Sequence, residues 1–397
     1  MRDTTAVHPG FATEPIPPHG AGQVLLPRLV DAGRAEELRA RAAELPAIRL
    51  SSRESSDLAL LGMGAYTPLE GFMTSSDYAR VTRDMHRSDG VFWPIPITLA
   101  VSHEDARSAR TKGAAALIYA DGSLAGTLTV TDVFTPDRRV ECRHVFGTDD
   151  PAHPGVASVL SAPPVYLGGP VDVLDLGPLY RRYPTLCLTP AEARTAFSAR
   201  GWNSVAAFQT RNPMHRSHEH LAKIALEVCD GVFIHQVLGR LKPGDLPAEV
   251  RVEAIDALVT HYFPPGRVLQ AGYPIEMRYA GPREALLHAV IRQNYGASYL
   301  VVGRDHAGVG HYYGPYDAQH IFTTLKPDDL VIRPLTFGEA FYCQRCEGMA
   351  SVRTCPHPAE LRVSVSGTEL RERLAQGAEP PLHFTRPEVW EVLTRRR

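Results

Sequence analysis

The sequence predicts an α/β protein whose second half contains a Rossmann-like parallel sheet. From about residue 190 onward, short apolar runs alternate with longer segments that repeat their apolar residues at helical spacing. This alternation is what a parallel sheet with crossover helices requires. We expect strands at 204–209, 231–238, 267–271 and 298–303, and helices at 190–200, 216–229, 247–263 and 281–295. Before residue 179 the pattern changes to short strands between Gly, Asp and Pro turns, which predicts a separate β-rich domain.

Three domains are therefore expected, over residues 1–178, 179–335 and 336–397. The first should contain a helix at 35–44 and strands near 95–101, 115–119, 123–134 and 140–146. Residues 1–20 are rich in proline, so we expect an extended arm on the surface or on a partner subunit. A helix at 315–325 and a strand at 330–335 should lead into a small C-terminal domain.

Composition excludes several classes of protein. The chain has 397 residues, of which 44% are hydrophobic and 22% charged, as in ordinary soluble globular proteins. A net charge of −2 argues against a broad nucleic-acid-binding face, which usually needs a basic stripe. The sequence has neither a secretory start nor an apolar run near the roughly 20 residues of a membrane span. We expect a cytoplasmic protein without nucleic-acid or membrane partners.

The most informative segment is residues 208–220, Phe-Gln-Thr-Arg-Asn-Pro-Met-His-Arg-Ser-His-Glu-His. It lies where an expected strand turns into an expected helix, and a helix N-terminus offers unpaired N–H groups to an anion. Arg211 adds a fork of donors that suits a tetrahedral oxyanion. Residues 303–306 end a second strand, and ligands of parallel sheets bind beyond the carboxyl ends of the strands. The two segments should therefore meet in one phosphate-binding site.

These residues also carry a resemblance. The strand followed by His-x-x-His resembles the nucleotidyltransferase superfamily, and Gln209-Thr210-Arg211-Asn212-Pro213 resembles the ATP sulfurylases (sulfate adenylyltransferases), in their zinc-containing bacterial and archaeal form. Residues 277–285, 303–308 and 366–371 match family segments in order, and 17–20, 68–73 and 93–98 are also similar. The resemblance implies a Rossmann-like nucleotidyltransferase core, a PUA-like N-terminal domain and a small zinc-bearing C-terminal domain.

The implied reaction is attack of sulfate on the α-phosphorus of ATP, which yields adenosine 5′-phosphosulfate and pyrophosphate in the first step of sulfate assimilation. The resemblance implies that sulfate is held by Gln209, Arg211 and the backbone N–H near Ala307. It assigns catalytic roles to Thr210, Arg211, Asn212, His215 and His218, with all but Arg211 also contacting the nucleotide. The remaining implied nucleotide contacts are Gln209, Gly303, Arg304, Asp305 and His306, with the backbone at 349–350 bordering the adenine. Mg²⁺ should bridge the phosphates, because it prefers substrate oxygens and water.

A second cluster holds Cys343-x-x-Cys346 and Cys355-Pro-His357. Four such ligands would form a closed structural zinc site with no position left for substrate. The Cys-x-His spacing is tighter than usual, so His357 rests on weaker grounds than the three cysteines. Buried or redox-active thiols are the alternative interpretation.

Other interpretations remain open. The chain could be another adenylyltransferase of the same fold, although Gln209 and Arg211 favour a small oxyanion over a large acceptor. It could also be a non-catalytic RNA-binding protein, which its near-neutral charge opposes. A homo-oligomer, most simply a dimer, is expected. Three positions depart from the family pattern, since Val309 and Gln236 stand where relatives commonly have proline and Arg240 replaces a more usual polar residue.

Overall fold

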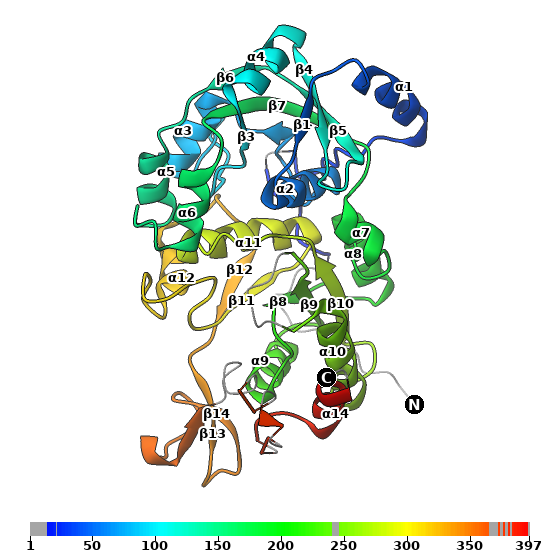
Figure 1. Ribbon diagram of the computed structural model, residues 1–397. Helices are drawn as coiled ribbons and strands as arrows, with labels where there is room; N and C mark the ends of the chain where they lie inside the picture. Colours follow the sequence, from blue (N-terminus) through cyan, green and yellow to red (C-terminus); the bar gives the residue numbers. More distant parts are fainter. Residues whose placement is uncertain are drawn as a thin grey trace.

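The computed structural model describes residues 14–20, 22–239, 246–364, 372–373, 376–377, 380–381 and 383–395. Figure 1 shows an N-terminal domain above, a second α/β domain below it, and a small β-hairpin module at the far end. The family-like segment 366–371 and Arg240 lie outside the described residues. Because no described helix combines the length and apolar character of a membrane span, the described part of the chain contains no candidate for one.

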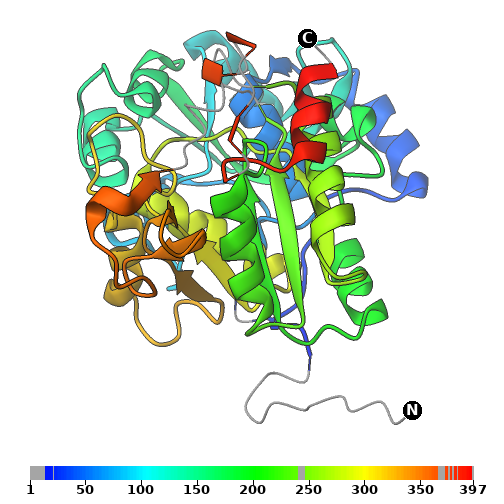
Figure 2. The ribbon, with the colours of Figure 1, turned by 90° about the horizontal axis from the view of Figure 1, so that it is seen from below.

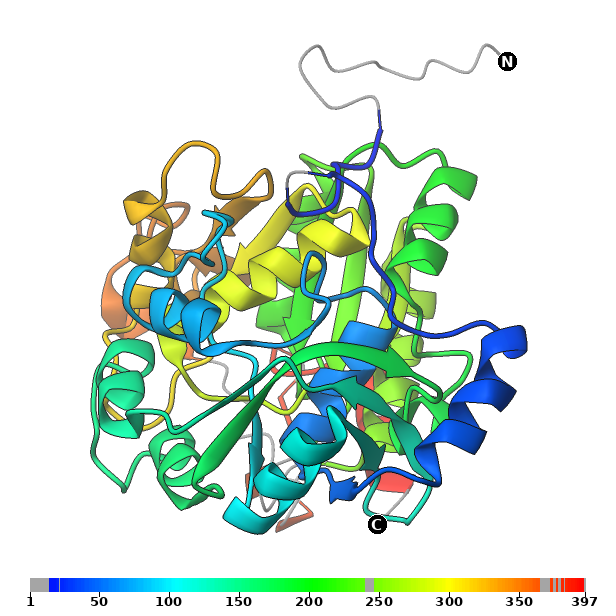
Figure 3. The ribbon, with the colours of Figure 1, turned by 90° about the horizontal axis from the view of Figure 1, so that it is seen from above.

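The N-terminal domain is built on a seven-stranded sheet in the order β1-β4-β5-β7-β2, with β3 and β6 also paired to β7. Its strands are β1 (Ala47–Arg49), β2 (Gly71–Phe72), β3 (Leu99–Val101), β4 (Ala114–Ile118), β5 (Leu124–Thr129), β6 (Asp132–Phe134) and β7 (Val165–Val173). Figure 3 shows β7 running across the domain as the longest of them. The flanking helices are α1 (Ala32–Ala42), α2 (Ser52–Gly62), α3 (Ser75–Asp84), α4 (His103–Lys112), α5 (Arg138–Val145) and α6 (Pro154–Ser161).

One expected strand is wrong, because residues 140–146 lie in helix α5 and its C-terminal end. The alternation of Val140, Cys142 and Phe146 with polar residues suggested a strand. Instead Asp137 accepts a hydrogen bond from the N–H of Val140 and starts a helix. The helix buries Glu141, Cys142 and Val145, which share a face at helical spacing. The expected strand 123–134 is interrupted as well, between β5 and β6.

The second domain confirms the Rossmann-like prediction. Five parallel strands lie in the order β10-β9-β8-β11-β12, namely β8 (Val205–Thr210), β9 (Gly231–Val237), β10 (Val268–Tyr273), β11 (Tyr299–Val302) and β12 (Arg333–Thr336). The associated helices are α7 (Pro178–Arg182), α8 (Pro190–Ala199), α9 (Arg216–Leu226), α10 (Ala248–Tyr262), α11 (Gly281–Tyr295), α12 (Asp317–His320) and the 3-10 helix η1 (Ile321–Thr324). The chain moves outward in one direction from β8 through β10 and then returns to add β11 on the other side of β8. This reversal creates a topological switch point between β8 and β11.

Helix α11 joins the two domains, and Figure 1 shows it lying between the N-terminal domain and the parallel sheet. Almost all of its residues are buried. Just before it, the buried Arg278 donates to both carboxylate oxygens of Asp57 on α2, at 2.6 and 2.7 Å. Near its end, Asn294 donates to the carbonyls of Ala65 and Thr67. The His19 N–H in turn donates to Asn294, so the described part of the N-terminal arm packs against this helix.

The remaining chain forms an antiparallel sheet of β13 (Ala340–Cys343), β14 (Gly348–Ser351) and β15 (Arg362–Ser364), with the 3-10 helix η2 (Ala359–Leu361). Helix α9 packs against β13 and β14. The last helix, α14 (Pro387–Arg395), lies along α10 rather than on this small sheet (Figure 2). The domain boundaries at residues 178 and 335 stay a prediction.

Candidate active site

A cleft of about 600 Å³ opens at the carboxyl ends of β8 and β11, at the topological switch point. Ligands of doubly wound sheets bind at this position. The residues expected to bind sulfate and the phosphates, and those expected around the nucleotide after β11, all line this cleft: Gln209, Thr210, Arg211, Asn212, His215, His218, Gly303, Arg304, Asp305, His306 and Ala307. The expected adenine border at 349–350 is not part of its lining, since both residues lie in β14.

His215 and His218 stack on one another at the start of α9. Their ring centroids are 3.8 Å apart and their planes differ by 22°. His215 is the N-cap residue of α9, with extended backbone, and His218 follows three residues later on the same helical face. The ring of His218 also meets the edge of Phe208 from β8. Packing therefore holds both rings at the helix N-terminus, inside the cleft.

Both imidazoles are held in the neutral form. Burial lowers the pKa of His215 well below 6.5, and the neighbouring His218 adds to this effect. Burial alone lowers the pKa of His218 to about 4. The Nδ1 atoms of both rings are buried and make no hydrogen bond in the described structure. Each neutral ring carries one N–H donor, so the pair offers donors rather than charge to a ligand.

Gln209 and Arg211 sit on either side of Thr210 at the end of β8. The Gln209 carboxamide oxygen accepts from Nη2 of Arg292 at 2.6 Å. Nη1 of Arg211 donates to the Tyr279 hydroxyl at 3.3 Å, with the guanidinium 5.9 Å from the centre of that ring. The Thr210 hydroxyl closes a tight turn by accepting from the Asn212 N–H and donating to the Asn212 carbonyl. This turn directs the polar groups after β8 towards the cleft.

The loop after β11 has an unusual backbone. Asp305 and Ala307 adopt φ values of 56° and 55°, in the left-handed region that residues with a Cβ seldom enter. Tyr279, on the facing loop, has a φ of 60°. The Ala307 carbonyl accepts from the Gly281 N–H at 3.1 Å and links this loop to the start of α11. Strained backbone of this kind clusters at ligand sites, where the surrounding structure holds it in place.

Arg304 forms ion pairs with Asp305 at 3.0 Å and with Glu339 at 2.9 Å. The side chains of all three are more than 40% exposed, so these pairs contribute little to folding stability. All three residues also line the cleft, so these ion pairs lie at its exposed rim. Glu339 directly precedes β13. Its pairing with Arg304 brings the small C-terminal sheet to the edge of the site.

Several residues of the cleft were not expected from the sequence. Met277, Tyr279 and Glu339 line it, while Arg292 and His288 lie behind Gln209 on α11. The segment 277–285 had been identified by its resemblance, but its functional residues could not be separated from those that start the helix. Arg292 and His288 had no sequence signal, because a helix buried on all sides has no polar face to mark them.

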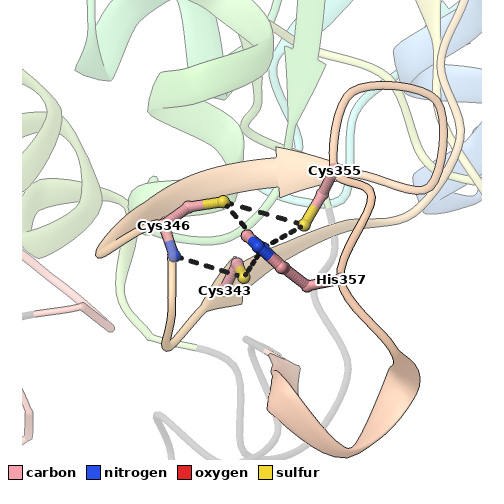
Figure 4. A group of neighbouring side chains, drawn as sticks. All are labelled: Cys343, Cys346, Cys355 and His357. Atoms are coloured by element: carbon pink, nitrogen blue, oxygen red, sulfur yellow. Dashed lines mark hydrogen bonds between the residues drawn. The ribbon is translucent and has the colours of Figure 1, made fainter.

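The expected metal ligands Cys343, Cys346, Cys355 and His357 come together at one end of the small sheet (Figure 4). Nδ1 of His357 lies 3.2 to 3.5 Å from the three sulfurs, and the sulfurs of Cys346 and Cys355 are 3.8 Å apart. A zinc tetrahedron separates two sulfurs by about 3.8 Å, and sulfur from nitrogen by about 3.6 Å. The four atoms therefore have the spacing of a four-coordinate metal site.

The environment of Cys343 favours a thiolate. Burial acts to raise the pKa of this thiol, but the Cys346 N–H and the neighbouring sulfurs outweigh burial and lower the pKa to about 6. A deprotonated sulfur is the form that binds a metal. No disulfide is present among the described residues, because all of their cysteines are free.

Comparisons with known proteins agree with this architecture. Residues 184–396 match the ATP-sulfurylase family model, and residues 16–176 match the PUA-like domain model. The chain is 52% identical to the sulfate adenylyltransferase of Chlorobium chlorochromatii over 96% of this chain and 94% of that protein. It is 51% identical to the sulfate adenylyltransferase of Psychrobacter cryohalolentis, over 98% of this chain and 94% of the relative. A solved structure titled hexameric APS kinase from Thiobacillus denitrificans superposes with a TM-score of 0.73 and 26% identity, covering 96% of this chain and 68% of that one.

Proposed function

Since the chain belongs to the ATP-sulfurylase family, we propose that its cleft transfers the adenylyl group of ATP to sulfate. The observation that carries the proposal is the meeting of two kinds of donor in one cleft. Gln209 and Arg211 suit a small tetrahedral oxyanion, and the stacked pair of His215 and His218 suits phosphate at a helix N-terminus.

The reaction needs positioning and charge stabilisation more than proton transfer. One sulfate oxygen forms a bond to the α-phosphorus, and the bond from that phosphorus to the oxygen bridging to the β-phosphate breaks. Pyrophosphate leaves with the electron pair of the broken bond. Sulfate is already a dianion at neutral pH, so no general base is required. The barrier comes from bringing two anions together and from charge on the α-phosphate and the leaving group.

We assign roles to the cleft residues on this basis. Gln209, Arg211 and the peptide N–H at Ala307 hold sulfate. Thr210 and Asn212 position the α- and β-phosphates, and His215 and His218 donate to the charge that develops in the transition state. Gly303, Arg304, Asp305 and His306 border the nucleotide. Neutral imidazoles can serve this role, because each ring has one N–H that donates a hydrogen bond without being transferred.

Mg²⁺ fits the site as a partner of ATP. The carboxylates of Asp305 and Glu339 at the rim are both engaged by Arg304, so they do not form a dedicated metal cage. Mg²⁺ binds phosphate oxygens and water readily, and its charge would offset that of the triphosphate. The ion is expected to arrive with the nucleotide.

Zinc fits the cluster of Cys343, Cys346, Cys355 and His357. Three sulfurs and one imidazole nitrogen at these spacings suit tetrahedral Zn²⁺, with no ligand position left for a substrate. The ion would join the end of β13 and the turn before β14 to the loop that follows β14. Because Glu339 and Ala340 at the start of β13 line the cleft, this structural zinc would also support one wall of the active site.

The assembly is proposed to be a homodimer, in a cytoplasmic location. The similarity to a chain titled hexameric supports an oligomer without fixing the number of subunits. Sedimentation velocity of the purified protein, at several concentrations, would give the number directly. A monomer at all concentrations would contradict the proposal.

Release of pyrophosphate from ATP, measured with and without sulfate, tests the proposed function. We expect release to depend on sulfate and on Mg²⁺, with equimolar adenosine 5′-phosphosulfate as the second product. Arg211→Ala should abolish most of this dependence. Release that requires a phosphopantetheine or nicotinamide nucleotide, and not sulfate, would instead identify another adenylyltransferase.

A further inference from the structure

Among the described residues, no carboxylate pairs with the buried cation of Arg292. It lies on α11 and has no exposed surface. Its guanidinium stacks 4.0 Å from the ring centre of Tyr273 and makes no ion pair within the described structure. Its Nε and Nη1 atoms are buried and have no hydrogen-bond partner there. A buried charge is costly unless it is compensated, so this arrangement calls for an explanation.

The hydrogen bond from its Nη2 to the carboxamide oxygen of Gln209 points to that explanation. A guanidinium has only donors, so the end of the Gln209 amide that faces it must be the oxygen. The amide nitrogen is thereby turned the other way. It lies 3.6 Å from the sulfur of Met277 and 3.5 Å from Nε2 of His288. Both N–H groups of that nitrogen therefore lie on the side of the amide that faces Met277 and His288, and Gln209 and Met277 both line the cleft.

Neighbouring groups hold the amide on its second side. His288 is fully buried, and its Nδ1 lies 3.1 Å from Nε2 of His306, which lines the cleft. The carboxylate of Glu284 accepts the backbone N–H groups of Arg278 and Ala280, and its Oε1 also lies 3.6 Å from Nε2 of His288, which fixes that ring. Gln209 therefore sits between one donor-only group and a chain of two imidazoles, and it has little freedom to rotate.

We propose that Arg292 is a positioning residue for the acceptor anion, acting through Gln209. It makes the Gln209 amide present its nitrogen, never its oxygen, to a tetrahedral dianion in the cleft. An amide free to flip would place a partial negative charge against that dianion for part of the time. The bound dianion would also be the counter-charge that Arg292 lacks. This inference rests on the proposed function, and it adds the residue that orients the acceptor site.

The test compares Arg292→Met with wild type in steady-state assays of sulfate-dependent pyrophosphate release. Methionine keeps the length and apolar contacts of the side chain but removes the charge and the donors. Because a lost charge-assisted hydrogen bond corresponds to about a 10- to 100-fold change, we expect the KM for sulfate to rise by that factor. The KM for ATP should stay unchanged. Arg292→Lys, which retains a charge and a donor, should recover part of the affinity for sulfate.

Arg283→Met is the matched control on the same helix. Arg283 donates to the carbonyls of Val81 and Thr82 in the N-terminal domain and does not line the cleft. This variant should lower the melting temperature without changing the KM for sulfate. A purely structural role for Arg292 would make the two variants behave alike, with equal changes for both substrates, and would overturn the inference.

The double variant with Gln209→Ala tests whether Arg292 acts through Gln209. If it does, adding Arg292→Met to Gln209→Ala causes no further rise in the KM for sulfate. Additive losses would contradict the proposed path. If Arg292→Met does not fold, Gln209→Glu provides the test. Its carboxylate can pair with Arg292 but cannot donate a hydrogen bond to the bound anion. Use of sulfate at the wild-type KM would therefore refute the inference. Absence of sulfate-dependent activity in wild type would refute the proposed function instead.

Discussion

Replacement of His218 by alanine separates its proposed catalytic role from its effect on stability. The side chain is one of two stacked imidazoles at the N-terminus of α9, and no described group uses its Nδ1 atom. Removal of a preorganised donor to developing charge costs about 100-fold or more in turnover. We therefore expect the kcat of His218→Ala to fall by that factor, with a smaller change in the KM for ATP.

The same substitution should change how folding stability depends on pH. Burial lowers the pKa of His218 from 6.5 to about 4, so the unfolded chain binds this proton more readily than the folded one. The free energy of unfolding of the wild type should then fall as the pH drops from about 6.5 to 4, and level off below. For this one group the loss is about 3 kcal/mol. The His218→Ala variant has no such group to titrate. The difference in free energy of unfolding between wild type and variant should therefore be smaller at pH 4 than at pH 7, by about 3 kcal/mol.

Two measurements check this reasoning. Initial rates of pyrophosphate release at saturating ATP and sulfate give the change in kcat, and urea unfolding between pH 4 and 7 gives the stability difference. His220→Ala serves as the control, because this histidine follows on α9 but does not line the cleft. Turnover near that of the wild type in folded His218→Ala would refute the catalytic role. A stability difference that is independent of pH would refute the buried neutral form.

Three further predictions concern the acceptor site and the metal. Arg211→Ala should weaken the use of sulfate more than that of ATP, by roughly 1.5–3 kcal/mol in kcat/KM for sulfate, and equal losses would contradict its assignment. Molybdate, which has the shape and charge of sulfate, should drive continuous conversion of ATP to AMP and pyrophosphate, and no release would place the acceptor elsewhere. Metal analysis should find about one zinc per chain, lost in Cys346→Ser together with thermal stability but retained in Cys229→Ser, since a closed site couples metal binding to folding. Metal-free protein purified without chelator would rule this site out.

The fold of the second domain followed from local patterns. Residues 205–210, 231–237 and 299–302 are buried at every position but Gln209 and Tyr299, which is typical of strands covered on both faces. For residues 140–146 the local pattern led to the wrong prediction of a strand. In a short segment, alternating apolar residues do not distinguish a strand from a helix with one buried face. There the Asp137 cap and the face shared by Cys142 and Val145 decided for helix.

The candidate site was predictable where its residues are contiguous. Gln209, Arg211 and the two histidines lie within one strand-turn-helix segment, so a local pattern placed them together. The cysteine cluster was predictable for the same reason, because its ligands occupy only fifteen positions from Cys343 to His357. Spacing left the fourth ligand open. The sheet geometry brings Nδ1 of His357 to the three sulfurs.

The sequence by itself therefore determined the alternation of strands and helices in a Rossmann-like domain, the anion-binding turn and the candidate metal ligands, since each is marked by residues close together in the chain. Only the tertiary structure decided which groups, distant in the sequence, orient the side chains of the cleft. Arg292 reaches Gln209 across 83 positions, and Arg304 reaches Glu339 across 35. These contacts exist because α11 is enclosed between the two domains and β13 folds back to the edge of the cleft. Hydrogen-bond direction and burial act through space, so no periodicity along the chain could have shown that Arg292 is buried with no carboxylate beside it in the described part of the structure.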